Sequence, residues 1–104
     1  MDNQKIDNKF FIVNEALLDV KKKYKKHNNE IGFFFEDNIL KAFSSYCPHL
    51  GGPLECVDNK EFYCHFHGYK FSKKGECISH KIKLNVVFFK VTIEEGRVYV
   101  WENL

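Results

Sequence analysis

The stretch SSYCPHLGGPLECVDNKEFYCHFHGYKF, residues 44–71, carries most of the metal-binding and nucleophilic side chains of this 104-residue chain. It contains three of the four cysteines and three of the five histidines. Two mixed pairs stand out, Cys47 with His49 and Cys64 with His67, and glycines lie close to both. Glycine permits a positive φ and a close approach of the backbone to a bound group. The pattern therefore predicts two loops that hold one inorganic centre.

The composition predicts one small domain with a modest core. Aromatic residues make up 16% of the chain, with eleven Phe, so the core is built from a few large side chains. Small cores of this kind often gain stability from a cross-link or a metal centre. The formal charge of +2 is too small to indicate a nucleic-acid or membrane partner.

Targeting features point to the cytoplasm. No apolar stretch reaches the roughly 18 residues that a membrane span needs. The N-terminal MDNQKIDNKF lacks the basic and then apolar pattern of a secretory signal. Cytoplasmic thiols stay reduced, so four cysteines favour metal ligation over disulfides.

Turn residues divide the chain into short strands. IGFFFE and ILKAFS flank Asp37-Asn38, and VVFFKVTIEE and RVYVW flank Glu95-Gly96, which predicts two tight hairpins. Asp58-Asn59 and Lys73-Lys74-Gly75 mark two further turns, and FFIV at 10–13 predicts an opening strand. Seven or eight short strands with regular turns predict an all-β fold, a small antiparallel β-sandwich or barrel.

Two N-terminal segments are less regular. The residues from Asn14 to Val20 predict a short helical turn with Asn14 as its N-cap. The run VKKKYKKH, residues 20–27, fits a helix face and a strand face equally well, because Val20 and Tyr24 are its only apolar residues. Its lysines could suggest a nucleic-acid patch, but a solvated sheet edge or helix face is the more ordinary interpretation.

Three interpretations of the mixed pairs compete. Core cysteines and surface histidines scattered by chance would rarely produce two such pairs in glycine-containing loops. A structural zinc site usually takes Cys with Cys and His with His, whereas here each loop supplies one of each. In a Rieske 2Fe–2S centre, two His replace two Cys on one iron. Each loop can then send its Cys to one iron and its His to the other.

The sequence CPHLGGPL…CHFHGYKF resembles the Cys-x-His and Cys-x-x-His signature of Rieske proteins, with 14 residues between His49 and Cys64. The order of turns from Asp37-Asn38 to the closing RVYVW is also similar, so the resemblance covers most of the chain. It implies a Rieske-type fold with a two-loop cluster-binding subdomain. It also implies a single Rieske 2Fe–2S domain over residues 1–104, with cluster-binding loops at about 45–72.

The resemblance implies a ligand set for one cluster per chain. Cys47 and Cys64 would bind the inner iron through sulfur, and His49 and His67 would bind the outer iron through Nδ1. His65 follows Cys64 directly and would point elsewhere. Two cysteines, Cys56 and Cys77, match no ligand position and are expected to be small hydrophobic residues.

Departures from the family pattern indicate the class of Rieske protein. Respiratory and photosynthetic members resemble CTHLGC…CPCHGS, whose extra cysteines form a disulfide, and carry Ser and Tyr hydroxyls near the cluster. In this chain Gly52 and Phe66 occupy the positions of the two extra cysteines, and Tyr69 and Phe71 occupy the positions of the Ser and the Tyr. Loss of hydrogen bonds to sulfur predicts a potential near the bottom of the roughly −150 to +300 mV Rieske range. Tyr69 is expected to pack over the cluster.

The resemblance implies a soluble, low-potential Rieske-type ferredoxin, which is an electron-transfer protein and not itself an enzyme. It would carry single electrons from a flavin-dependent ferredoxin reductase to a terminal Rieske oxygenase. Docking is expected to be apolar and local, around Leu50, Gly51, Pro53 and Gly68, because the oxidised centre adds no net charge. Two alternatives stay open: a small Rieske subunit of a nitrite-reductase-like enzyme, and a zinc-stabilised, non-redox binding module.

Overall fold

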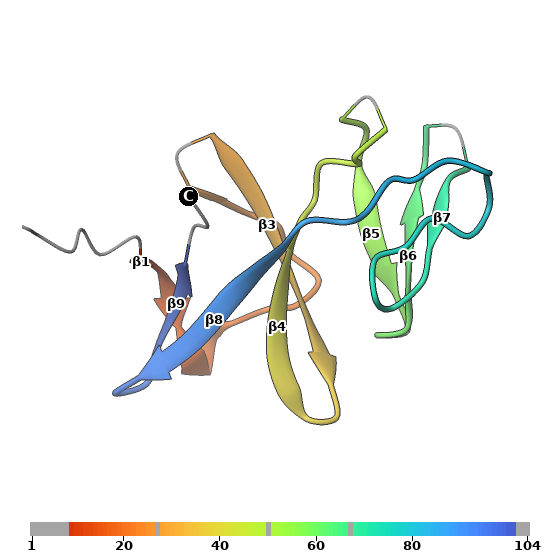
Figure 1. Ribbon diagram of the computed structural model, residues 1–104. Helices are drawn as coiled ribbons and strands as arrows, with labels where there is room; N and C mark the ends of the chain where they lie inside the picture. The colour runs from red at the N-terminus through yellow and green to blue at the C-terminus, as the bar shows by residue number, and fades with distance from the viewer. Residues whose placement is uncertain (1–8, 27, 50, 67, 102–104) are drawn as a thin grey trace, which may run out of the picture.

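The computed structural model describes residues 9–26, 28–49, 51–66 and 68–101. Within these residues the chain forms nine strands and one short 3-10 helix (Figure 1). In order, the elements are β1 Lys9–Asn14, η1 Glu15–Leu17, β2 Tyr24–Lys26, β3 Asn29–Glu36, β4 Ile39–Ser44, β5 Leu54–Val57, β6 Glu61–Cys64, β7 Lys70–Phe71, β8 Phe88–Glu94 and β9 Arg97–Trp101. None of the described residues belongs to a helix with the length and apolar character needed to cross a membrane.

The strands form two antiparallel sheets that lie side by side (Figure 1). The larger sheet has the order β1-β9-β8-β4-β3-β2, and its edge strands β1 and β2 contact each other, so it nearly closes into a barrel. The smaller sheet has the order β5-β6-β7. The predicted all-β antiparallel fold is confirmed. The strand beyond the predicted seven or eight is β5, in a segment where no strand was expected.

The predicted hairpin turns are confirmed by the backbone. Asp37-Asn38, Asp58-Asn59 and Glu95-Gly96 each have a positive φ at both residues. Asp37-Asn38 and Glu95-Gly96 are two-residue hairpin loops, for which this is the type I′ conformation. Asp58-Asn59 is part of a three-residue loop, because Val57 pairs with Glu61. The turn at Lys73-Lys74-Gly75 also forms, with a hydrogen bond of 2.8 Å from Gly75 N–H to the Ser72 carbonyl.

The two irregular segments near the N-terminus differ in outcome. Glu15–Leu17 forms a helical turn, as predicted, but within the described residues the Asn14 side chain makes no capping hydrogen bond. In the lysine-rich run, Tyr24–Lys26 is a strand paired with β3 at the end of the six-stranded order, so the strand interpretation holds there. His27 lies outside the described residues. Lys23 Nζ donates a 2.8 Å hydrogen bond to the Leu54 carbonyl, which ties this run to β5.

The hairpin of β3 and β4 faces two separate cores because successive side chains of a strand point to opposite faces. Phe33 and Ala42 point into the core enclosed by the six-stranded sheet, which we call the barrel core. Phe34 and Phe43 point into the core next to the Cys/His loops, which we call the cluster-side core. The barrel core consists of Ile31, Phe33, Leu40, Ala42, Val98 and Val100. The cluster-side core consists of Phe34, Phe43, Cys47, Leu54, Phe62, Cys64, Phe71 and Val86.

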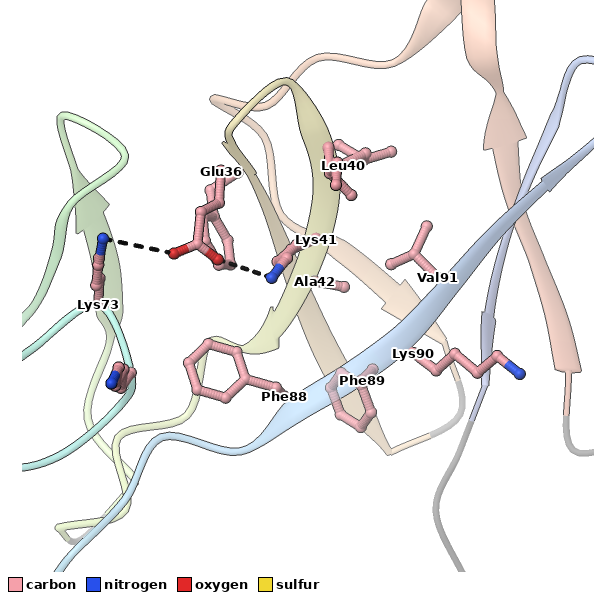
Figure 2. Close-up of a pocket in the computed structure, with 12 residues that line it drawn as sticks. Glu36, Leu40, Lys41, Ala42, Lys73, Phe88, Phe89, Lys90 and Val91 are labelled. Atoms are coloured by element: carbon pink, nitrogen blue, oxygen red, sulfur yellow. Dashed lines mark hydrogen bonds and ion pairs between the residues drawn. The ribbon is translucent and has the colours of Figure 1, made fainter.

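An ion pair links the two parts of the molecule away from the Cys/His loops. The Glu36 carboxylate contacts Lys41 Nζ at 2.7 Å and Lys73 Nζ at 3.9 Å (Figure 2). Glu36 and Lys41 belong to the six-stranded sheet, whereas Lys73 lies in the turn after β7. These residues line a pocket of about 610 Å³ beside β4 and β8, and among the described residues no Cys or His side chain lines it.

Candidate metal centre

The first Cys/His pair lies in a loop whose backbone is fixed at both ends. Ser45 N–H donates to the Glu30 carbonyl at 2.8 Å, and the Ser45 carbonyl accepts from Leu54 N–H at 2.9 Å. Between these anchors, Cys47 N–H bonds to the Gly52 carbonyl at 2.7 Å. The loop thus folds back on itself just after β4, and it holds Cys47 at its base.

The chain also turns back on Cys47 itself. Gly51 N–H bonds to the Cys47 carbonyl at 2.9 Å, and Gly51 has a φ of +72°, a conformation that favours glycine. The backbone N–H of His49 donates to Cys47 Sγ at 3.3 Å. An N–H donor of this kind stabilises negative charge on the sulfur.

The second pair begins at the end of β6. Cys64 N–H donates to the Tyr69 carbonyl at 2.8 Å, and Gly68 N–H donates to the Cys64 carbonyl at 3.2 Å. The segment between Cys64 and Tyr69 therefore forms a tight loop, with Gly68 at a φ of +68°. His67, the fourth expected ligand, lies outside the described residues.

Pairing of β5 with β6 brings the two loops together. Leu54, which follows the first loop, is the register partner of Cys64. His65 N–H also donates to the Pro53 carbonyl at 3.3 Å, which joins the loops directly. The two cysteines that the sequence placed in separate loops are therefore neighbours at one end of the small sheet, and His49 lies beside Cys47.

The absence of a side chain at Gly52 lets the Phe66 ring and Cys64 Sγ pack closely against its backbone. A Cβ at position 52 would lie 2.8 Å from the Phe66 ring and 3.1 Å from Cys64 Sγ. Gly52 and Phe66, the positions of the disulfide in respiratory relatives, are thus in contact here without a covalent bond. None of the four cysteines, all of which are described, forms a disulfide.

The site is a buried, sulfur-rich environment. Cys47 and Cys64 are 2% and 0% exposed, and Nδ1 of His49 is buried as well. Burial raises the pKa of the Cys47 thiol to about 11, and the neighbouring Cys64 thiol adds to this, while the His49 N–H opposes it. Metals bind the thiolate, so a bound metal would displace the thiol proton.

The Cys and His residues that were not expected to be ligands, His65, Cys56 and Cys77, make other contacts. His65 Nε2 lies 2.9 Å from Glu55 Oε1, a contact that connects β6 to the neighbouring strand β5. The hydrogen bond from His65 lowers the pKa of the Glu55 carboxyl. Cys56 and Cys77 pack against the cluster-side core as partly buried residues.

Tyr69 packs directly on the first pair. Its ring is stacked on the His49 ring, with centroids 4.0 Å apart and an interplanar angle of 17°. The other contact was missed from the sequence: the His80 ring also stacks on Tyr69, at 3.8 Å and 7°. His80 lies in the long segment between β7 and β8, far from the Cys/His motif in sequence, and no local pattern marked it.

The donor set fits a 2Fe–2S cluster of Rieske type. Such a cluster takes two thiolates on one iron and two imidazoles on the other. Two buried thiols next to a buried imidazole nitrogen supply three of these four donors, and the expected fourth, His67, lies outside the described residues. Within the described residues, no group of three Cys, His, Asp or Glu side chains is arranged to hold a single metal ion.

Comparison with known proteins agrees with a Rieske-type cluster. Residues 8–90 match the Rieske [2Fe-2S] domain family. Among curated proteins, the chain is similar to cholesterol 7-desaturase nvd of Bombyx mori, with 26% identity over 77 residues. That alignment covers 65% of this chain and 17% of the desaturase.

Solved structures share the fold at low sequence identity. The Sphingomonas yanoikuyae B1 ferredoxin has a TM-score of 0.72 and 20% identity, covering 92% of this chain and 100% of that one. A chain in the complex of reduced oxygenase and oxidized ferredoxin in carbazole 1,9a-dioxygenase has a TM-score of 0.70 and 18% identity, covering 95% and 99%. Apo dicamba monooxygenase has a TM-score of 0.71 and 20% identity, covering 94% and 34%. The chain thus spans about a third of the oxygenase.

Proposed function

The chain belongs to the Rieske 2Fe–2S domain family, and from this premise we propose that it is a soluble, low-potential ferredoxin that carries single electrons to a Rieske-type oxygenase. Its cofactor is a Rieske-type 2Fe–2S cluster. The observation that carries the proposal is the pair of buried thiols, Cys47 and Cys64, held beside the buried Nδ1 of His49 by two joined loops.

We propose four ligands, with Cys47 and Cys64 on one iron and His49 and His67 on the other. When bound, the cluster supplies a one-electron couple. The chain's own contribution is to exclude water from both sulfurs and to direct the His49 N–H toward Cys47 Sγ. The Tyr69 ring covers one face of His49 and limits its rotation.

The residues near the loops support the proposed low potential. Phe71 is fully buried in the cluster-side core and carries no hydroxyl that could bond to sulfur. Tyr69 lies with its ring between two imidazoles. Fewer hydrogen bonds to the sulfurs leave the added electron less stabilised. A midpoint well above 0 mV in a redox titration followed by EPR would contradict this part of the proposal.

The proposed partners are a flavin-dependent ferredoxin reductase and a terminal oxygenase. The surface beside the loops is apolar, with Tyr46 and Phe66 among its exposed large side chains. Pro53 is exposed next to them, whereas Leu50 lies outside the described residues. Docking through such a surface predicts that the electron-transfer rate depends weakly on ionic strength between low and physiological salt. A steep decline with added salt would instead indicate charge steering.

The proposal includes a single domain over residues 1–104 and a cytoplasmic location. The absence of a disulfide among the four cysteines suits a reducing compartment. The β3–β4 hairpin contributes side chains to both cores, which supports one folding unit.

The first experiment is purification under anaerobic conditions. We expect a red-brown protein that takes up one electron per chain and gives a rhombic EPR signal when reduced. The reduced protein should then support turnover by a Rieske oxygenase supplied with its substrate. A colourless protein that contains zinc and no iron would contradict the proposal and favour a non-redox binding module.

A further inference from the structure

An imidazole from outside the two loops completes a stack of three rings on the proposed ligand His49. His49, Tyr69 and His80 follow one another, with centroid distances of 4.0 Å and 3.8 Å. Both contacts are close to parallel, at 17° and 7°. Tyr69 is therefore held between two imidazoles, of which one is at the site and the other, His80, is exposed at the surface.

His80 is held in this position by the strand that follows Tyr69. The Ser79 hydroxyl accepts a 2.8 Å hydrogen bond from Lys70 N–H and lies 2.6 Å from His80 Nδ1. Ile78 N–H donates to the Lys70 carbonyl at 2.8 Å. Both backbone groups of Lys70 thus fasten the segment that carries His80 next to Tyr69. The position of His80 on the ring is set by these bonds.

The stack constrains the ring that would bind iron. His49 lies in an irregular loop after β4, where no strand pairing restrains its side chain. A ring packed flat against its face restricts its rotation, provided that the packing ring is itself held. Tyr69 is only partly buried, and His80 covers its other face. Removal of His80 would let Tyr69 tilt and would admit water next to His49.

We propose that His80 is a positioning residue for the cluster, which acts through Tyr69 to hold the His49 ring and to exclude water from its face. The inference rests on the proposed function, because it assigns His49 as a ligand. Outer groups that orient a metal ligand influence both the affinity of the metal and its potential. Solvent near an iron–sulfur cluster is one of the factors that set its potential, since water stabilises the more negative reduced form.

The test compares His80→Ala with His80→Phe in the full-length protein. We expect the alanine variant to give a broadened EPR signal and a higher midpoint potential than the wild type. It should also lose iron to a chelator roughly five-fold faster, the factor expected for loss of one stacked aromatic pair. Phenylalanine keeps a flat ring on Tyr69 but loses the contact with Ser79, so its signal, potential and release rate should lie between those of the alanine variant and the wild type.

Two further variants separate positioning from general stability. Ser79→Ala keeps the imidazole but removes the group that fixes it, so we expect a smaller shift in the same direction. Lys81→Ala changes the exposed neighbour of His80 and should leave all three readouts unchanged. A lower melting temperature with wild-type EPR, potential and iron release in both His80→Ala and Ser79→Ala would overturn the proposal.

Failure of the two proposals can be told apart. A wild-type protein that assembles no cluster contradicts the proposed function and with it the role of His80. A wild-type protein with a normal Rieske signal, together with a His80→Ala variant identical to it, contradicts the role of His80 alone.

Discussion

The six-stranded sheet and the three-stranded sheet are stabilised in different ways. The larger sheet has strands of up to eight residues, and aliphatic residues such as Val98 and Val100 contribute to the barrel core. The smaller sheet has strands of four, four and two residues. Its core consists largely of packed aromatic rings and of the two cysteines proposed as ligands. The smaller sheet therefore depends much more on side-chain packing and on its loops.

This difference explains how the site is built. Short strands are marginal by themselves, so backbone pairing alone would not fix two loops next to each other. The cluster-side core places Cys47 and Cys64 among Phe43, Phe62 and Phe71, and strands β3, β4 and β8 contribute side chains to both cores. Metal binding adds stability where ligands come from separate segments. We expect the smaller sheet to gain most from the cluster.

The largest expected effect is the loss of a proposed ligand from the smaller sheet. Cys64→Ala should abolish the visible absorption and the EPR signal, because the proposed inner iron would lose one of its two thiolates. The matched control is Cys56→Ala, which changes a partly buried cysteine two positions from the chain reversal at Asp58-Asn59. The control should keep its cluster. Retention of the signal in Cys64→Ala would refute the ligand assignment.

Truncations in the two cores should separate stability from site geometry. Phe62 packs edge-on or tilted against Phe34 and Phe43, with centroids 5.3 Å and 4.9 Å away, and it lies two residues before Cys64. Phe62→Leu and Val98→Ala should each cost about 2 kcal/mol of stability. This corresponds to a decrease in the melting temperature of roughly 10 °C for a domain of this size.

Only the change at Phe62 should alter the EPR line shape, because Val98 belongs to the barrel core. Equal broadening of the EPR signal in both variants would mean that packing in the barrel core also controls the geometry of the site.

A smaller effect is expected from added volume between the loops. Gly52→Ala places a methyl group 2.8 Å from the Phe66 ring and 3.1 Å from Cys64 Sγ. Overpacking of this kind should cost about 1–2 kcal/mol and reduce cluster content. Phe66 is 64% exposed, so its ring can be removed at little cost. The double variant Gly52→Ala with Phe66→Ala should recover part of the melting temperature, and no recovery would place the conflict at Cys64.

The smallest effect concerns the ion pair that joins the two parts. The hydrogen bond and the charge of Lys41 lower the pKa of Glu36 below its ordinary value of 4.5, and Lys73 contributes less. Because the pKa is lower in the folded state, the ionised carboxylate stabilises the fold at pH values above the pKa of the unfolded state. This contribution is lost as the pH falls through the pKa of the folded state. The pair is solvent-accessible, so the effect is small.

The comparison of Glu36→Gln with the wild type should therefore show a small deficit in melting temperature near neutral pH that disappears in acid. Lys73→Ala should produce a weaker version of the same pH dependence, since its contact is 3.9 Å long. A deficit that grows in acid would mean that the carboxylate does not stabilise the fold.

The sequence by itself determined the hairpins and the chemistry of the site. Asp37-Asn38, Asp58-Asn59 and Glu95-Gly96 specify turns because few residues adopt a positive φ, and this preference is local. The mixed Cys/His pairs are equally local, since the spacing and the donor type are written in adjacent residues. For the same reason the identity of the cofactor followed from two short motifs.

Tertiary structure alone decided which distant residues support those motifs. Strand β5 forms because Leu54–Val57 pairs with β6, although LECV shows no strong strand pattern of its own. The Lys23 bond to Leu54 and the stacking of His80 on Tyr69 join residues that are not neighbours in the sequence. Such contacts depend on how two sheets pack and on where a long connection crosses the site. No propensity or spacing of neighbouring residues encodes them.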